Sequence, residues 1–259
     1  MGAVSSRISR QRPLGSSVNQ REPDEDEIMD LVKTARIAGF LYLCVFLTGI
    51  FSLIYVPSHI YAAGDAASTV RNIVESDPLF RLGIASELVG HAIFLILPLA
   101  LYKLLGRVNR EAAVLMVAFA VISVPLDFVI NINKLDVLTL LSGPDYTRAL
   151  SSGDLQARVM LSLKSYDNGI LVCKLFWGLW LLPFGYLVFK SGFLPRTLGV
   201  LLMLGCLGYL IDFGGQMLFP GYAHASAARF IRLPAAFGEL GICLWLLIMG
   251  AKERKPSVG

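Results

Sequence analysis

Residues 111–133 read EAAVLMVAFAVISVPLDFVININ, an apolar stretch that carries Asp127 and Asn131 inside it. A run of about 18 or more residues with few charges is typical of a helix that crosses a membrane. The stretch is long enough to span a hydrocarbon core of about 30 Å at a rise of about 1.5 Å per residue. It therefore predicts a spanning helix that places a carboxylate within the bilayer.

Five more apolar segments of similar length flank this one. They are Arg36–Tyr55, Phe80–Lys103, Tyr166–Lys190, Leu194–Phe219 and Arg232–Gly250. The 259-residue chain is 55% hydrophobic and only 16% charged, whereas a soluble domain averages about 25% charged residues. We therefore expect an all-α fold, a bundle of six transmembrane helices over residues 33–250.

Lysine and arginine residues crowd the short connections on one side of the expected membrane. They are Lys33, Arg36, Lys103, Arg107, Arg110, Lys190, Arg196, Lys252, Arg254 and Lys255. Cytoplasmic loops favour these residues, so the pattern predicts a multi-pass protein of the cell membrane with both termini in the cytoplasm. Residues 1–32 are expected to form a disordered cytoplasmic tail, and residues 251–259 a short basic one. The net charge of +4 is small and follows the loops, which argues against a nucleic-acid-binding protein.

Five acidic residues fall inside the expected spans, where a charge is costly and usually marks a functional site. Polar neighbours share their helix faces: Glu87 is followed by His91, and Asp127 by Asn131 and Lys134, at helical spacing. The candidate ligand-binding residues are Glu87, His91, Asp127, Asn131, Asp167, Lys174, Asp212, Gln216 and Glu239. All the charged members fall in the outer half of the expected membrane, so we expect one polar pocket that opens to the outer face.

Two pairs of dipeptides recur at the same spacing along the chain. Leu97-Pro98 is echoed by Leu182-Pro183, and Asp127-Phe128 is echoed by Asp212-Phe213. A duplicated helical hairpin would produce this pattern, with the two copies related by an axis along the membrane normal. Echoes in apolar sequence also arise by chance, so both explanations stay open.

The acids outnumber the intramembrane lysines, so some of them must be protonated, bind a cation or meet water. The leading hypothesis is therefore a membrane protein that binds or moves a small molecule or a cation through the pocket. A second hypothesis is an intramembrane metal-dependent hydrolase, for which His59, His91 and His224 are weak candidate ligands. A third is a structural or assembly subunit whose charged pairs only fix helix packing.

Enzyme signatures are missing from the chain, which has no P-loop, nucleophile elbow or Rossmann fingerprint. A non-enzymatic role is therefore favoured. The four cysteines, Cys44, Cys173, Cys206 and Cys243, lie in separate apolar runs and are expected to be small core residues. No cofactor is expected beyond the metal that a hydrolase would need. The expected partners are the lipid bilayer and the small molecule or cation.

Several short motifs resemble the DUF4386 family of uncharacterised bacterial membrane proteins. They are ARIAG at 35–39, GDA at 64–66, RLG at 81–83, SGFLPRTLGVLL at 191–202, GYL at 208–210 and Asp212. The resemblance covers residues 33–250 and leaves the N-terminal tail outside. It implies a six-helix inner-membrane protein. It implies no activity, so no catalytic residue is carried over to this chain.

Overall fold

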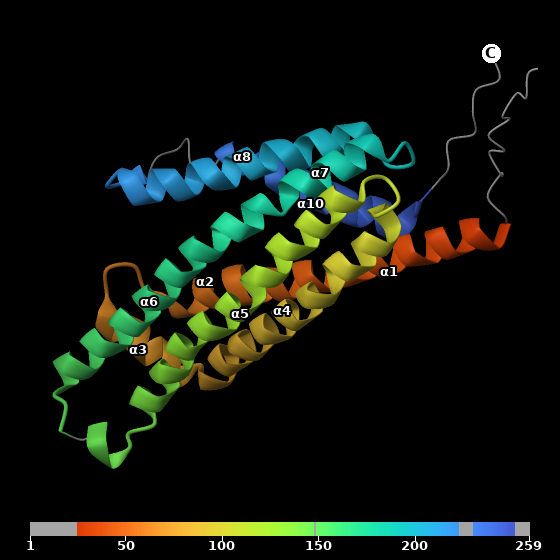
Figure 1. Cartoon of the computed structure of the whole chain (residues 1–259). Coiled ribbons are helices and arrows are strands. Elements are labelled where there is room, and N and C mark those ends of the chain that lie inside the picture. The colour runs from red at the N-terminus through yellow and green to blue at the C-terminus, as the bar shows by residue number, and fades with distance from the viewer. Residues whose placement is uncertain (1–24, 148, 223–229, 252–259) are drawn as a thin grey trace, which may run out of the picture.

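The computed structural model describes residues 25–147, 149–222 and 230–251, and every regular element in these ranges is helical. The long helices run alongside one another in an elongated bundle (Figure 1). The expected tails lie mostly outside the described residues, at 1–24 and 252–259. Helix α1 begins at Glu25, so residues 25–32, which the sequence assigned to the N-terminal tail, are helical.

The first apolar segment consists of three helical pieces without a break between them. Helix α1 (Glu25–Ile50) passes into a five-residue π-helix, η1 (Phe51–Tyr55), and then into α2 (Val56–Ile60). A short helix, α3 (Ala66–Glu75), follows and lies at the end of the bundle where α6 begins (Figure 1). Asp65 caps α3 by accepting a hydrogen bond from the backbone N–H of Ser68 at 2.9 Å. Hydrogen bonds from Ser68 lower the pKa of Asp65, because they stabilise its carboxylate form.

The remaining helices complete the bundle. They are α4 (Asp77–Leu105), α5 (Arg110–Leu141), η2 (Asp145–Thr147, a 3-10 turn), α6 (Ser152–Leu179), α7 (Leu181–Lys190), α8 (Arg196–Leu218) and α10 (Leu233–Ile248). Helices α6 and α7 form one almost continuous rod, since the N–H of Phe184 still bonds to the carbonyl of Trp180 at 3.2 Å. The break falls just before Pro183, which has no N–H to continue the helical ladder.

Five helices in the described residues are long and apolar enough to cross a membrane. They are Met29–Ile60, Asp77–Leu105, Arg110–Leu141, Ser152–Lys190 and Arg196–Leu218. The sixth expected span, α10, is apolar but has 16 residues, somewhat short of the roughly 20 that a span needs. The predicted all-α fold is therefore confirmed for the described residues, and five of the six expected helices are long and apolar enough to span a membrane.

Two helices extend well beyond the expected spans. Helix α5 continues past Asn133 to Leu141, and α6 begins at Ser152 rather than near Tyr166. The hydroxyl of Ser151 explains the early start, because it accepts a hydrogen bond from the backbone N–H of Asp154 at 3.1 Å and caps the first turn. A capping serine in a polar segment gives a weaker sequence signal than an apolar run.

The helices pack through small residues and leave large apolar side chains outside. Helix α1 packs against α4 and α10, α5 against α4 and α6, and α8 against α7 and α10. Phe40 and Leu218 are exposed, as suits a surface that faces lipid. A buried cluster around Leu97, Trp180 and Phe184 fills the space between the helices.

Glycine at position 39 sets the approach of α1 to α10. A methyl group at Gly39 would lie 2.8 Å from the Leu247 Cα and 2.9 Å from the Leu246 carbonyl carbon. Both are backbone atoms, which cannot move aside without shifting a helix. We expect Gly39→Ala to lower the free energy of unfolding in detergent by about 1–3 kcal/mol.

Gly49 provides the matched control on the same helix, because a methyl group there meets nothing within 4 Å. Gly49→Ala should leave stability unchanged or raise it by about 0.5–1 kcal/mol, the usual preference of helices for alanine. Equal effects of the two substitutions would contradict the close approach of α1 and α10.

Candidate functional site

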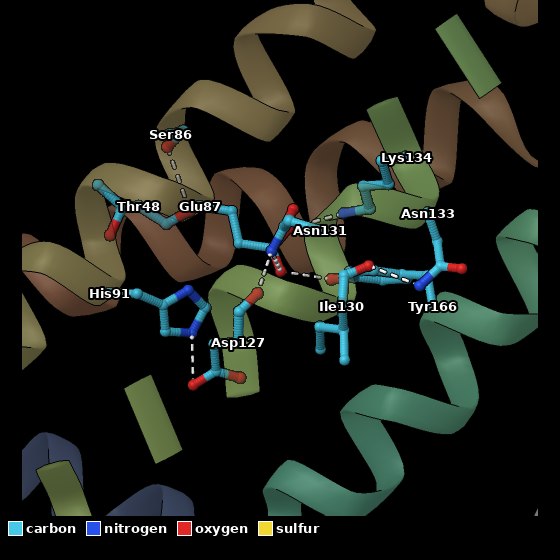
Figure 2. A network of polar contacts seen from close by, with 10 residues as sticks. All are labelled: Thr48, Ser86, Glu87, His91, Asp127, Ile130, Asn131, Asn133, Lys134 and Tyr166. Atoms are coloured by element: carbon cyan, nitrogen blue, oxygen red, sulfur yellow. Dashed lines mark hydrogen bonds and ion pairs between the residues drawn. The ribbon is translucent and has the colours of Figure 1, made fainter. Parts of the chain in front are cut away.

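Glu87 of α4 joins three helices through a buried polar network. Its side chain is 1% exposed. One carboxylate oxygen, Oε2, accepts a hydrogen bond from Lys134 Nζ at 2.6 Å. The other, Oε1, accepts hydrogen bonds from the Tyr166 hydroxyl at 2.6 Å and from Asn131 Nδ2 at 3.1 Å. Figure 2 shows these side chains converging from α4, α5 and α6.

The positive charge of Lys134 has a second favourable contact besides the Glu87 carboxylate, since its Nζ lies 3.7 Å from the centroid of the Tyr166 ring. A cation over an aromatic face is attracted by the electrons of the ring. Lys134 and Tyr166 belong to this network although neither was among the candidate ligand-binding residues. The helical spacing from Asp127 and Asn131 pointed to Lys134, whereas the hydroxyl of Tyr166 has no comparable sequence signal.

Asp212 of α8 forms a second, looser ion pair with α6. Its Oδ2 lies 3.4 Å from Lys174 Nζ and accepts a hydrogen bond from Gln216 Nε2 at 2.9 Å. Asp212 is buried, whereas the Lys174 side chain is 19% exposed. A longer and partly solvated pair is weaker than the one at Glu87.

Asp127 of α5 contacts a histidine instead of a lysine. It is 0% exposed, and its Oδ2 lies 3.3 Å from His91 Nε2 of α4 (Figure 2). The thiol of Cys173 and the indole N–H of Trp177, both on α6, also lie near Asp127. Within the described ranges, neither carboxylate oxygen of Asp127 has a hydrogen-bond donor of good geometry.

Glu239 of α10 accepts a hydrogen bond from the hydroxyl of Tyr42 of α1 at 2.8 Å. The ring of Tyr42 is tilted against Trp180, with centroids 6.0 Å apart. Among the residues that the structure describes, Glu239 forms no ion pair with lysine, arginine or histidine. This acid therefore lies in an aromatic environment, and no cation of the described residues pairs with it.

The five acids thus fall into three groups. Glu87 and Asp212 are paired with lysines, and Asp167 is exposed at the surface of α6. Asp127 and Glu239 have no lysine or arginine partner in the part of the chain that the structure describes. The surplus of carboxylates inferred from the sequence is located at these last two residues.

A cavity of about 340 Å³ lies between α1, α4, α6, α8 and α10. Its polar lining includes Glu87, His91, Glu239, Thr48 and Ser52. Aromatic residues make up much of the remaining wall: Tyr42, Phe46, Phe94, Trp177, Trp180 and Tyr209. We call this space the aromatic cavity.

The rim of the aromatic cavity is built by η1 and the end of α1. Ile50, Leu53 and Ile54 line it and are also exposed on the outside of the bundle, Ile54 by 63%. The hydroxyl of Ser52 is buried in the same wall and has no hydrogen-bond partner among the described residues. A π-helix is rare and often occurs at functional sites. The cavity therefore opens on an apolar side of the bundle.

The expected single pocket is divided in the structure. A second hollow, of about 440 Å³, is lined by Asp167, Lys174 and Gln216 together with Lys164, Asn168 and Tyr222. Asp127, Asn131 and Asp212 line neither hollow and are buried between the helices. The nine candidate residues are thus shared among two hollows and the interior.

The residues described do not assemble the ligand set that the hydrolase hypothesis needs. His59 is exposed on α2, where its Nδ1 lies 2.8 Å from the carbonyl oxygen of Tyr55. His224 lies outside the described residues. In the ranges that are described, no group of three or more His, Cys, Asp or Glu side chains is placed to hold a metal ion.

The two echoed aspartates occupy related positions. Asp127 lies on α5 and faces His91 of the preceding helix α4, and Asp212 lies on α8 and faces Lys174 of the preceding rod α6–α7. Each hairpin therefore carries one aspartate on its second helix and its basic partner on the first. The two pairs differ in chemistry, since lysine has a fixed charge at neutral pH and histidine does not.

The fold and the site are those of an all-helical protein with a polar interior, in which five helices of the described residues are long and apolar enough to cross a membrane. A model of the family described as "Domain of unknown function (DUF4386)" matches residues 37–250, and the chain belongs to this family.

An uncharacterized protein of the archaeon Archaeoglobus fulgidus is 38% identical over 78 residues, which cover 30% of this chain and 44% of that protein. The chain therefore spans less than half the length of this relative in the match. No solved structure matches the chain.

The Glu87–Lys134 pair should dominate the stability of this region. Lys134→Met leaves the Glu87 carboxylate buried without its cation, and we expect the free energy of unfolding in detergent to fall by about 3–5 kcal/mol. Combining it with Glu87→Gln should restore most of the loss, because no buried charge then remains. Lys174→Met is the comparison and should cost less, since its pair is longer and partly exposed. An equal loss at the two lysines would contradict this ranking.

Proposed function

We propose that this protein binds a small lipophilic cation in the aromatic cavity. The observation that carries the proposal is the Glu239 carboxylate, which faces the cavity beside Tyr42 and has no cationic partner among the described residues. Aromatic faces attract organic cations, and a carboxylate supplies the opposite charge. A cavity of about 340 Å³ is within the usual range for a small-molecule site.

Comparison with the lysine-paired acids supports the proposal that Glu239 binds a cation. Glu87 and Asp212 have lysine partners and are accounted for as contacts that fix the helices relative to one another. Glu239 has the hydroxyls of Tyr42 and Tyr209 beside it, and among the described residues no lysine or arginine pairs with it. A hydroxyl cannot balance a carboxylate in an apolar surrounding, so a positive charge that enters the cavity must do so.

The position of the rim supports entry of the ligand from the bilayer. Leu53 and Ile54 line the aromatic cavity and are exposed on the outside of an apolar helix. A ligand with its own apolar surface would pass this rim more easily than a hydrated inorganic ion. This is why we propose an organic cation as the ligand.

For the arrangement in the membrane we propose six spans with both termini in the cytoplasm of the cell. Helix α10 would be the sixth span, and its shortness would require local thinning of the bilayer or support from neighbouring helices. The lysine and arginine residues at the 103–110 and 190–196 connections support this orientation. The aromatic cavity then lies in the outer half of the membrane.

Cysteine labelling tests this topology. In intact cells a membrane-impermeant maleimide should label Ser152→Cys, at the outer end of α6, and should label Glu111→Cys only after lysis. Both positions are exposed. The four native cysteines are buried or partly buried, and the unmodified protein gives the background. Labelling of both variants from the same side would contradict the proposed orientation.

Binding of benzyltrimethylammonium to the purified protein, measured by calorimetry, tests the cation site. Glu239→Gln removes the charge and keeps the shape, and we expect affinity to fall by roughly 10- to 100-fold, the worth of a charged contact. Neopentylbenzene, which has the same shape without the charge, should bind the unmodified protein more weakly than the cation.

Asp167→Asn is the matched control, because this acid lies in the other hollow. It should leave the affinity for benzyltrimethylammonium unchanged. If the cation does not bind, or if Glu239→Gln binds it as tightly as the unmodified protein does, the proposed function is wrong.

A further inference from the structure

Asp127, like Glu239, is an acid that has no lysine or arginine partner among the described residues. It is 0% exposed, and no lysine or arginine of the described residues pairs with it. Both of its carboxylate oxygens lack a hydrogen-bond donor of good geometry in these ranges. An ionised carboxylate in such a place is strongly disfavoured unless a positive charge or a proton comes with it.

The basic group in contact with Asp127 is the imidazole of His91, whose Nε2 lies 3.3 Å from Oδ2. His91 also lines the aromatic cavity, and its ring stacks on that of Trp177 with centroids 6.2 Å apart. Figure 2 shows His91 beside Asp127. The histidine therefore contacts the buried acid and also borders the ligand space.

We infer that His91 and Asp127 together hold a proton, and that this proton leaves when a cation enters the aromatic cavity. The inference rests on the cation site proposed at Glu239. As the cation enters, the proton passes from the His91–Asp127 pair to water, so the net charge of the cavity region does not change. Two positive charges in one water-poor space repel strongly, which links the two events.

Other ionisable groups around the pair do not replace this proton. On α4, Glu87 is already balanced by Lys134. On α6, Cys173 lies beside Asp127. Helix α7, which also packs on α5, carries only Tyr186 and Lys190 as ionisable residues. Across the cavity, Glu239 and its partner Tyr42 add a further acid, and no lysine or arginine of the described residues pairs with it.

Proton release on ligand binding is the direct test. Benzyltrimethylammonium is added to the purified protein in weakly buffered detergent solution with a pH-indicating dye. The unmodified protein should release protons in proportion to the cation bound, and Asp127→Asn should bind the cation without releasing them. Asp212→Asn, the echoed aspartate beside Lys174, should still release them. Release that persists in Asp127→Asn would overturn the inference.

A second readout needs no ligand. Protonated histidine quenches a stacked indole, so the tryptophan emission of the unmodified protein should change in a step as pH is varied. Trp177→Phe and His91→Gln should both remove this step, Asp127→Asn should displace it, and Asp212→Asn should leave it in place. A step that survives in His91→Gln, or that Asp127→Asn does not displace, would overturn the inference.

The two experiments separate the two proposals. If benzyltrimethylammonium does not bind, the cation site fails, and the emission step still decides whether His91 and Asp127 hold a proton. If the cation binds without any proton release, the cation site stands and the coupling is wrong. His91→Gln serves as the second variant in the release experiment should Asp127→Asn fold poorly. Because His91 lines the cavity, its result is read as protons released per cation bound, which should fall to none whatever the affinity.

Discussion

A carboxylate buried in an apolar surrounding needs a counter-charge, and this requirement shapes the interior of the protein. The cost of an unpaired buried charge is several kcal/mol or more. At Glu87 the requirement is met by a lysine, an amide and a hydroxyl from two neighbouring helices. Because these partners are 44, 47 and 79 residues away in the chain, satisfying this acid fixes α4, α5 and α6 relative to one another.

The apolar helices could be predicted from the sequence because length and hydrophobicity are local properties. Residues 111–133 sufficed to place the central part of α5, and only its extension to Leu141 was missed. The start of α6 was harder to predict, since it depends on the capping hydroxyl of Ser151 in a polar segment. The π-helix at Phe51–Tyr55 has no comparable signal in its own residues.

The partners of the acids could not be predicted in the same way. Helical spacing shows which polar residues share a face, and it correctly joined Lys134 to the stripe of Asp127 and Asn131. It does not show which helix that face meets. For charged pairs that only fix helix packing, the sequence suggested Asp127 with Lys174, whereas the structure pairs Lys174 with Asp212. Aromatic residues such as Tyr42 and Trp180 carry even less information, because most of them simply fill cores.

The two hairpins use related geometry for different chemistry. Lys174 gives Asp212 a permanent counter-charge, so this pair behaves as a fixed contact. His91 gives Asp127 a partner whose charge depends on a proton. A histidine that gains or loses a proton can affect ligand binding only if it lies near the ligand. His91 lines the aromatic cavity that contains Glu239, whereas Lys174 lines the other hollow. The pair whose charge depends on a proton is thus the pair that borders the cavity containing Glu239.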